Sequence, residues 1–112
     1  MTEDPKEQII QRINRDFLDI LVLRLIRGEP MWGYKIIKKT ERLFAIKLGH
    51  GALYPLLKSL EDNSYIKSKK IAKGGRVRKV YEITEKGIQV VDAYYDCLKD
   101  QLKKRDIEGT QS

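Results

Sequence analysis

The sequence predicts a mainly α, α+β domain that consists of three helices, a two-stranded β-hairpin and a long C-terminal helix. Three observations indicate this class. Apolar residues recur at helical spacing in several segments, and the pair Gly74-Gly75 separates two β-prone runs. The last segment repeats apolar residues in steps of three and four. At 112 residues, 41% of them hydrophobic, the chain has the size and composition of one globular domain.

The first predicted helix spans residues 9–27. Ile10, Ile13 and Phe17 are spaced for one helical face, whereas between residues 17 and 26 every position except Asp19 and Arg24 is apolar. A helix that is apolar on more than one face must be covered on more than one face. In so small a chain we expect a second subunit to supply part of that cover. The segment 28–30, Gly-Glu-Pro, ends the helix.

Two shorter helices are expected over residues 33–44 and 52–62. In the helix 52–62, four leucines form a core stripe, and Pro55 is tolerated because the first turn has backbone N–H groups without helical partners. The residues of the helix 33–44 that we expect to face inward are Tyr34, Ile37, Leu43 and Phe44, and those expected to face outward are Lys35, Lys38, Lys39 and Arg42.

The C-terminal third of the chain predicts a hairpin followed by a helix. Strands are expected over residues 65–72 and 77–84, because Gly-Gly between β-prone runs is typical of a tight hairpin turn. Thr84 is a suitable N-cap for a helix over residues 85–105. The apolar positions of this helix follow a heptad pattern over two heptads, which predicts a partner from another chain: Ile88, Val91, Tyr95, Leu98 and Leu102.

The positive charge is concentrated in the hairpin. The net charge is +7, and the segment 66–79 holds seven basic residues and no acidic one. The rest of the chain has 16 basic and 16 acidic residues, so its charges balance. A local excess of this kind indicates a contact surface for a polyanion.

Several classes of protein are excluded or made improbable by composition. One Cys and one His cannot form an intramolecular disulfide or a zinc site of the usual kind, and they supply no Ser/His/acid or Cys/His catalytic set. We therefore expect no metal, no cofactor and no enzyme activity. No apolar run approaches the roughly 20 residues of a membrane span, and residues 1–6 do not resemble a signal peptide, so we expect a cytoplasmic protein without a membrane partner.

Three helices, a hairpin with a basic tip and a terminal helix together form a winged helix-turn-helix with a dimerisation arm. The predicted organisation is a flexible tail over residues 1–8, a DNA-binding domain over 9–84, a dimerisation helix over 85–105 and a second tail over 106–112. In this fold the recognition helix, here 52–62, enters the major groove, and the wing, here 67–79, lies on the backbone or in the minor groove. The candidate DNA contacts are Lys35, Lys38, His50, Gly51, Ala52, Tyr54, Pro55, Lys58, Lys70, Lys73, Gly74, Gly75, Arg76 and Arg78.

Four stretches resemble the PadR-like transcriptional regulators. They are Gly-Tyr-Lys-Ile at 33–36, Gly-Ala-Leu-Tyr-Pro-Leu-Leu-Lys-Ser-Leu-Glu at 51–61, Tyr-Ile at 65–66 and Arg-Lys-Val-Tyr-Glu-Ile-Thr-Glu-Lys-Gly at 78–87. The resemblance covers roughly residues 15–105. It implies a homodimeric repressor whose C-terminal helix pairs with the N-terminal helix of the other subunit. Ala52 departs from the Thr or Ser that members often have before Leu-Tyr-Pro, which puts in doubt which bases are read.

The resemblance also implies two further sets of residues. The expected dimer interface comprises Ile10, Ile13, Phe17, Ile88, Val91, Tyr95, Leu98 and Leu102. Because some members resemble sensors of aromatic compounds, Phe17, Trp32, Tyr94 and Tyr95 are candidates to bind a small aromatic effector, although aromatic residues at helical spacing more often belong to a core. Two alternatives to a sequence-specific regulator of double-stranded DNA stay open: a non-specific architectural binder of nucleic acid, and a winged-helix module for protein–protein interaction.

Overall fold

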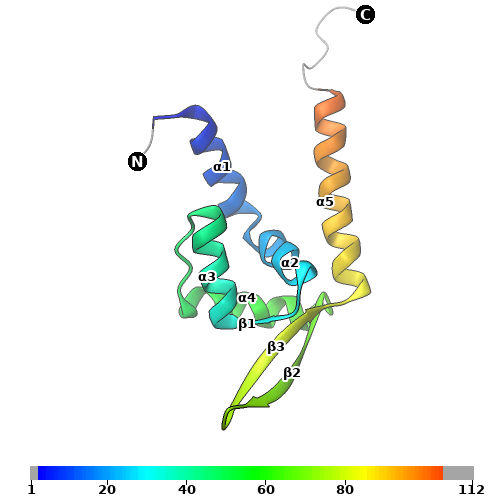
Figure 1. The fold of residues 1–112 in the computed structure, drawn as a ribbon. Helices are drawn as coiled ribbons and strands as arrows, with labels where there is room; N and C mark the ends of the chain where they lie inside the picture. The colour runs from blue at the N-terminus through cyan, green and yellow to red at the C-terminus, as the bar shows by residue number, and fades with distance from the viewer. Residues whose placement is uncertain (1–2, 105–112) are drawn as a thin grey trace, which may run out of the picture.

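The computed structural model describes residues 3–104 (Figure 1). Its elements are, in chain order, α1 (Pro5–Asp16), α2 (Leu18–Gly28), β1 (Met31–Trp32), α3 (Gly33–Phe44), α4 (His50–Asp62), β2 (Ile66–Lys73), β3 (Arg76–Ile83) and α5 (Glu85–Lys103). The predicted winged helix-turn-helix architecture is confirmed. The predicted tail 106–112 lies outside the described residues.

The single helix predicted over residues 9–27 is wrong, because the chain bends at Phe17. This residue has φ −115° and ψ 37°, and it separates α1 from α2. Helix α1 also begins at Pro5, where the Asp4 side chain accepts a hydrogen bond from the Lys6 N–H, so residues 5–8 are helical and not part of a tail. Neither Gly nor Pro marks the bend, and the apolar period runs through it, so the local sequence carries no sign of it.

Helix α2 lies at the centre of the hydrophobic core. Its Leu21, Val22 and Leu23 are at most 2% exposed, and α3, α4, the sheet and α5 each add side chains to the same core. These added residues are Ile36, Leu53, Leu57, Leu60, Met31, Ile66, Tyr81 and Val91. The leucine stripe predicted for the recognition helix therefore faces the core, with Leu56 half-buried.

The inward face of α3 differs from the prediction. Ile36 and Thr40 are fully buried, whereas Tyr34 is 47% and Leu43 51% exposed. A threonine hydroxyl can occupy this core position because it donates a hydrogen bond to the Ile36 carbonyl, at 2.7 Å. The prediction relied on hydrophobicity alone, and hydrophobicity gave no reason to turn a threonine inward.

The sheet has three antiparallel strands in the order β1-β3-β2. The predicted hairpin is confirmed to within one residue at each strand end, and Gly74 and Gly75 adopt the positive φ values of 57° and 77° that its turn requires. Strand β1 was not predicted, because its two residues are too few for any periodic pattern. It pairs with β3 through Met31↔Tyr81 and Trp32↔Val80.

Helix α5 begins as predicted and then leaves the body of the domain (Figure 1). The Thr84 hydroxyl caps it by accepting a hydrogen bond from the Gly87 N–H, at 3.1 Å. Val91 was expected at a dimer interface but is fully buried within the chain, because α5 packs there against α2. Beyond it, Leu98 and Leu102 are 39% and 71% exposed. No helix within residues 3–104 combines the length and apolarity needed to cross a membrane.

Candidate nucleic-acid interface

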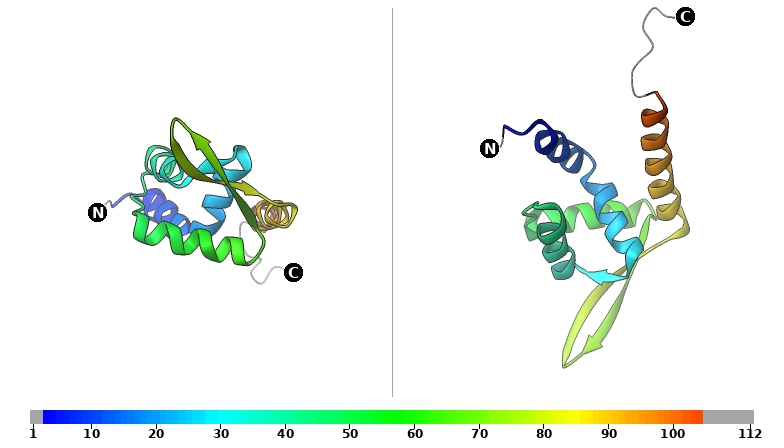
Figure 2. Two further views of the ribbon diagram at one scale, coloured as in Figure 1. Left: turned by 90° about the horizontal axis from the view of Figure 1, so that it is seen from below. Right: turned by 45° about the horizontal axis from the view of Figure 1, so that its top comes forward.

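The β2–β3 hairpin, here called the wing, projects from the helical body (Figure 2). Acidic residues outside its basic segment hold three of its seven cations. Lys67 and Lys69 contact Glu82, at 3.9 and 2.7 Å, and Lys79 contacts Glu61 of α4, at 3.6 Å. The hydrogen bond from Lys69 holds the pKa of Glu82 below its usual range. Sequence reasoning missed both acids, because it counted charge by segment, whereas strand register brings Glu82 to the wing lysines and helix packing brings Glu61 to Lys79.

Four wing cations, Lys70, Lys73, Arg76 and Arg78, have no carboxylate within 4.0 Å among the described residues. The strand register places positive charges beside one another, because Lys73 lies directly opposite Arg76 and Lys70 lies directly opposite Lys79. Like charges that face each other across strands are destabilising. A surface built in this way gains stability when an anion binds between its cations.

The exposed face of α4 adjoins the wing. The residues of α4 predicted to contact DNA are all exposed to solvent: His50, Gly51, Ala52, Tyr54, Pro55 and Lys58. Helix α4 begins at His50, two residues before the predicted start, and the His50 ring stacks on Tyr54 with 5.7 Å between ring centroids. Lys58 forms an ion pair with Asp62 one turn later, at 3.3 Å. Both side chains are largely exposed, so the pair is weak and can exchange for a DNA contact.

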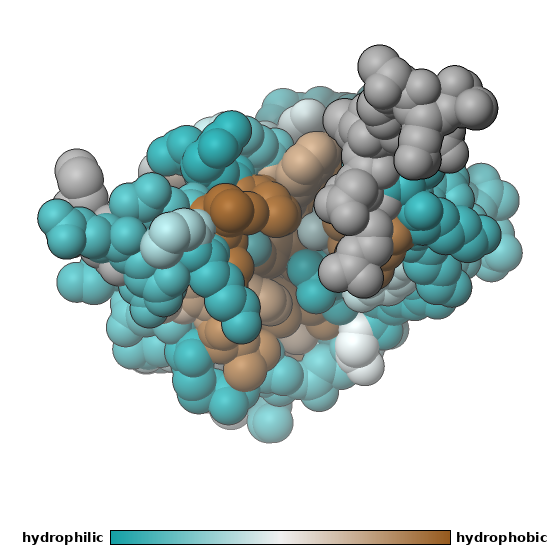
Figure 3. Space-filling view, turned by 90° about the horizontal axis from the view of Figure 1, so that it is seen from above, coloured by the Kyte–Doolittle hydropathy of each residue, from teal (hydrophilic) through white to brown (hydrophobic). Residues whose placement is uncertain are grey.

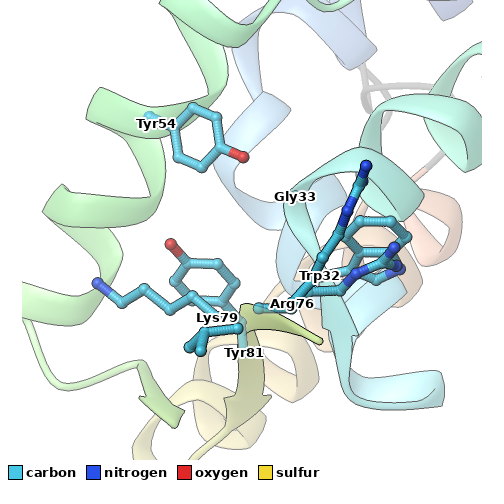
Figure 4. A pocket seen from close by; sticks show the side chains of 8 residues that line it. Trp32, Gly33, Tyr54, Arg76, Lys79 and Tyr81 are labelled. Carbon is cyan, nitrogen blue, oxygen red and sulfur yellow. The ribbon is translucent and has the colours of Figure 1, made fainter. Parts of the chain in front are cut away.

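Tyr54 lies against the N-terminus of α3. A Cβ atom at Gly33 would come within 2.5 Å of the Tyr54 hydroxyl, so the glycine makes the contact possible. The Tyr54 and Tyr81 hydroxyls point toward the same space, with Arg76 and Trp32 on its other side (Figure 4). Burial raises the pKa of Tyr81, and the negative charge of Glu61 raises it further.

This space is an open groove of about 420 Å³ between the wing and α4. Its lining residues are Trp32, Gly33, Tyr54, Arg76, Val77, Arg78, Lys79 and Tyr81. The groove therefore joins the predicted recognition helix to the predicted wing through aromatic rings, hydroxyls and cations. Hydroxyls and cations of this kind bind the sugar and phosphate parts of nucleic acid.

The two α3 lysines proposed as DNA contacts differ in their surroundings. Lys35 and Lys39 both reach the Oε1 atom of Glu29, at 2.7 and 3.0 Å. Their hydrogen bonds lower the pKa of Glu29 to about 2. Lys38 instead lies over the Tyr34 ring, with its Nζ 5.5 Å from the centroid. A phosphate would have to compete with Glu29 for Lys35 but not for Lys38.

Three of the four candidate effector-binding aromatics lie together. Phe17 and Tyr94 are 5.8 Å apart between ring centroids, and Tyr94 and Tyr95 are 5.7 Å apart. Arg24 joins them, since it donates a hydrogen bond to the Tyr95 hydroxyl at 3.1 Å. Trp32 lies apart from this cluster, against Tyr34 and Arg78.

The fold and this site define a class. A helix-turn-helix core with an exposed reading face and a basic hairpin wing is the architecture of winged-helix DNA-binding proteins. Residues 22–93, more than half of the chain, match the family model described as the transcriptional regulator PadR-like family. The chain belongs to the PadR-like family of transcriptional regulators, which are DNA-binding proteins and not enzymes.

Solved structures agree with this assignment. A PadR family transcriptional regulator from Eggerthella lenta DSM 2243 is 30% identical, with a TM-score of 0.69 over 91% of this chain and 92% of that one. A PadR family transcription regulator from Clostridium difficile R20291 is 26% identical, with a TM-score of 0.72 over 78% and 92%. A PadR-like regulator from Bacillus cereus, 23% identical, shares the fold with a TM-score of 0.73 over 88% and 98%. No curated protein sequence matches this chain.

Proposed function

We propose that this protein is a homodimeric, sequence-specific transcriptional repressor. The recognition helix, residues 52–62, enters the major groove, and the wing, residues 67–79, lies on the backbone or in the minor groove. The observation that carries the proposal is the set of four wing cations without carboxylate partners in residues 3–104, beside the exposed face of α4. Phosphate contacts hold such a protein in register, and contacts from the helix to base edges select the sequence.

The experiment that tests this proposal is a selection of bound genomic fragments at physiological salt. A two-fold dimer with two recognition helices prefers an inverted repeat with half-sites about one helical turn apart. An enriched inverted repeat upstream of a few genes, with raised transcription when the gene for this protein is deleted, is the expected result. Binding without an enriched sequence would support the architectural alternative, and the absence of binding would support the protein–protein module.

Exposed apolar residues support the homodimer. On α1, Ile9 and Ile10 are 52% and 43% exposed, and Leu98 and Leu102 of α5 are similarly open to solvent. Apolar side chains gather in the hollow between these two helices on the side from which both project (Figure 3). A contiguous apolar surface of this kind on a small domain indicates a protein interface. The proposed interface includes Ile13, Phe17, Ile88 and Tyr95 as well, and it excludes the internally buried Val91.

The aromatic cluster formed by Phe17, at the bend between α1 and α2, and by Tyr94 and Tyr95 of α5 supports a second function, the binding of a small planar aromatic effector. Phe17 and Tyr95 are 45% and 38% exposed, and the Arg24 guanidinium lies within 5.8 Å of the Phe44, Tyr94 and Tyr95 ring centroids. A planar ligand could stack there beside a cation. The expected result is that planar aromatic compounds raise the melting temperature and change DNA affinity in the native protein but not in Tyr95→Leu. An unchanged DNA affinity would remove this proposal.

A further inference from the structure

Trp32 is the single tryptophan of the chain, and it contacts the wing. The Arg78 Cζ atom lies 3.5 Å from the centroid of the Trp32 ring, which is the distance of a guanidinium in van der Waals contact with an aromatic face. The Trp32 ring also contacts Tyr34, at 5.5 Å between centroids, and the Lys38 Nζ lies over Tyr34. A cation from β3 and a cation from α3 thus lie at the two ends of an aromatic pair.

Strand pairing produces the Arg78–Trp32 contact. Trp32 lies directly opposite Val80 in the β1–β3 register, and Arg78 is two residues from Val80 on β3. Residues two apart on a strand share a face, so Arg78 is the diagonal cross-strand neighbour of Trp32. Because β1 ends at Trp32, the edge of β3 beside Arg78 is left to the groove between the wing and α4.

A stacked guanidinium keeps its binding capacity. The ring contact uses the flat face of the group, and the N–H donors point outward in its plane, where they can form two parallel hydrogen bonds to a phosphate. Arg78 has no carboxylate partner among the described residues, so no ion pair competes with a phosphate for those donors. Fixing a long side chain before binding lowers the entropy lost when its contact forms.

We propose that Trp32 is a positioning residue that holds the Arg78 guanidinium in the groove as a fixed contact to the DNA sugar–phosphate backbone. The inference rests on the proposed function, since it concerns how the wing meets DNA. It assigns Trp32 to the DNA interface and not to an effector site. It also predicts that lysine cannot replace Arg78, because lysine lacks the planar face and the paired donors.

A double-mutant cycle on DNA affinity tests the proposal. We expect Arg78→Ala to weaken binding by about tenfold or more per site. Trp32→Leu should weaken it by about two- to fivefold, although it changes no charge. In a protein that already carries Arg78→Ala, adding Trp32→Leu should weaken DNA binding by less than about twofold. The contact that Trp32 positions is already absent in that background. Arg78→Lys should resemble Arg78→Ala, and Trp32→Phe should restore most of the affinity.

Lys73→Ala is the matched control. Lys73 is a wing cation that contacts no aromatic ring in the part of the chain described. The effects of Lys73→Ala and Trp32→Leu on the free energy of DNA binding should therefore be additive. The salt slope gives a second readout. Trp32→Leu should reduce the slope of log affinity against log salt concentration toward the slope of Arg78→Ala, by about 0.9 for each lost phosphate contact. A purely structural role for Trp32 would not produce this reduction.

The fluorescence of Trp32 reports the contact directly. We expect Arg78→Ala to change the emission of the free protein, and DNA to change the emission of the native protein. Thermal melting of each variant identifies any that is not folded. If Trp32→Leu is not folded, Trp32→Met, which also removes the aromatic face, replaces it in the cycle. Additive effects of Trp32 and Arg78 substitutions, with native DNA binding intact, would overturn this inference alone. Loss of all DNA binding by the native protein would overturn the proposed function instead.

Discussion

Gly87 shows how one residue can limit the stability of this fold. A Cβ atom at this position would lie 2.2 Å from the backbone oxygen of Tyr65 and 2.7 Å from a side-chain carbon of Ile83. A backbone oxygen cannot move aside as a flexible side chain can. The first turn of α5 therefore packs directly on the chain that enters β2, and only glycine permits that approach.

We predict that Gly87→Ala destabilises the protein by about 2 kcal/mol or more, because overpacking a tight contact shifts the backbone. Thermal unfolding should show a melting temperature lower by roughly 8 °C or more. Gly28→Ala is the control, since a Cβ atom there meets nothing within 4 Å. Equal melting temperatures for the two variants would contradict the close approach at Gly87.

Glu29 connects two elements through charge. It follows α2 directly, and its carboxylate binds Lys35 and Lys39 of α3. The pKa of Glu29 is lowered to about 2 from an ordinary value of 4.5. A carboxyl whose pKa is lower in the folded state stabilises the fold above the unfolded value, and this contribution is lost as the pH falls from about 4.5 to about 2.

We predict that Glu29→Gln flattens the dependence of stability on pH in this acid range. Between pH 6 and about pH 2.5, the melting temperature of the native protein should fall further than that of the variant, because only the native protein has this carboxylate to protonate. Glu41→Gln, which removes a carboxylate of α3 without an ion pair in residues 3–104, should follow the native profile. Parallel profiles for the native protein and Glu29→Gln would contradict the interaction.

The wing has cations of two kinds, and substitutions should distinguish them. Arg76→Ala should weaken binding to all DNA sequences and reduce the salt slope by about 0.9 per contact, because Arg76 has no carboxylate partner in the described structure. Lys69→Ala should have a smaller effect, since Glu82 already neutralises Lys69 at 2.7 Å. Fluorescence anisotropy at several salt concentrations measures both. An unchanged salt slope for Arg76→Ala would contradict the assignment of the wing to the DNA interface.

The recognition helix should respond differently from the wing. Lys58→Ala and Tyr54→Phe should change the relative affinity for different sequences more than the affinity for random DNA, because α4 presents these side chains on its exposed face. Competition between an enriched site and its single-base variants measures this preference. A uniform loss across all sequences would assign both residues to phosphate contacts.

At the scale of the whole molecule, the second half of α5 is exposed to solvent along its length. Residues 95–103 are all exposed, and Leu102 is the most exposed large hydrophobic residue of the described chain, at 71%. We predict that Leu98→Glu together with Leu102→Glu converts a dimer to a monomer, because each charge would be buried without a counter-ion in the proposed interface. Light scattering coupled to size-exclusion chromatography measures the mass.

The same double variant should lose most of its affinity for an inverted repeat and keep weak binding to random DNA, since one wing and one recognition helix remain in each monomer. Val77→Glu, which charges an exposed apolar side chain of the wing, is the control and should stay dimeric. A native protein that is monomeric at micromolar concentration would contradict the homodimer.

The sequence by itself determined the class of fold and the location of its charge. Leu53, Leu57 and Leu60 encode one face of the recognition helix, and Gly74-Gly75 encodes the hairpin turn, through interactions between residues close in the chain. Local periodicity and turn chemistry suffice for such elements. The net charge of the wing can likewise be counted directly.

Only the tertiary structure decided what depends on residues distant in the chain. The bend at Phe17, the two-residue strand β1 and the inward turn of Thr40 leave no local pattern, because packing and long-range pairing select them. Strand register and helix packing also decided which wing cations Glu82 and Glu61 neutralise, and register alone brought Trp32 to Arg78. Composition shows how much charge a segment carries, but three-dimensional contacts determine how much of that charge is free to bind DNA.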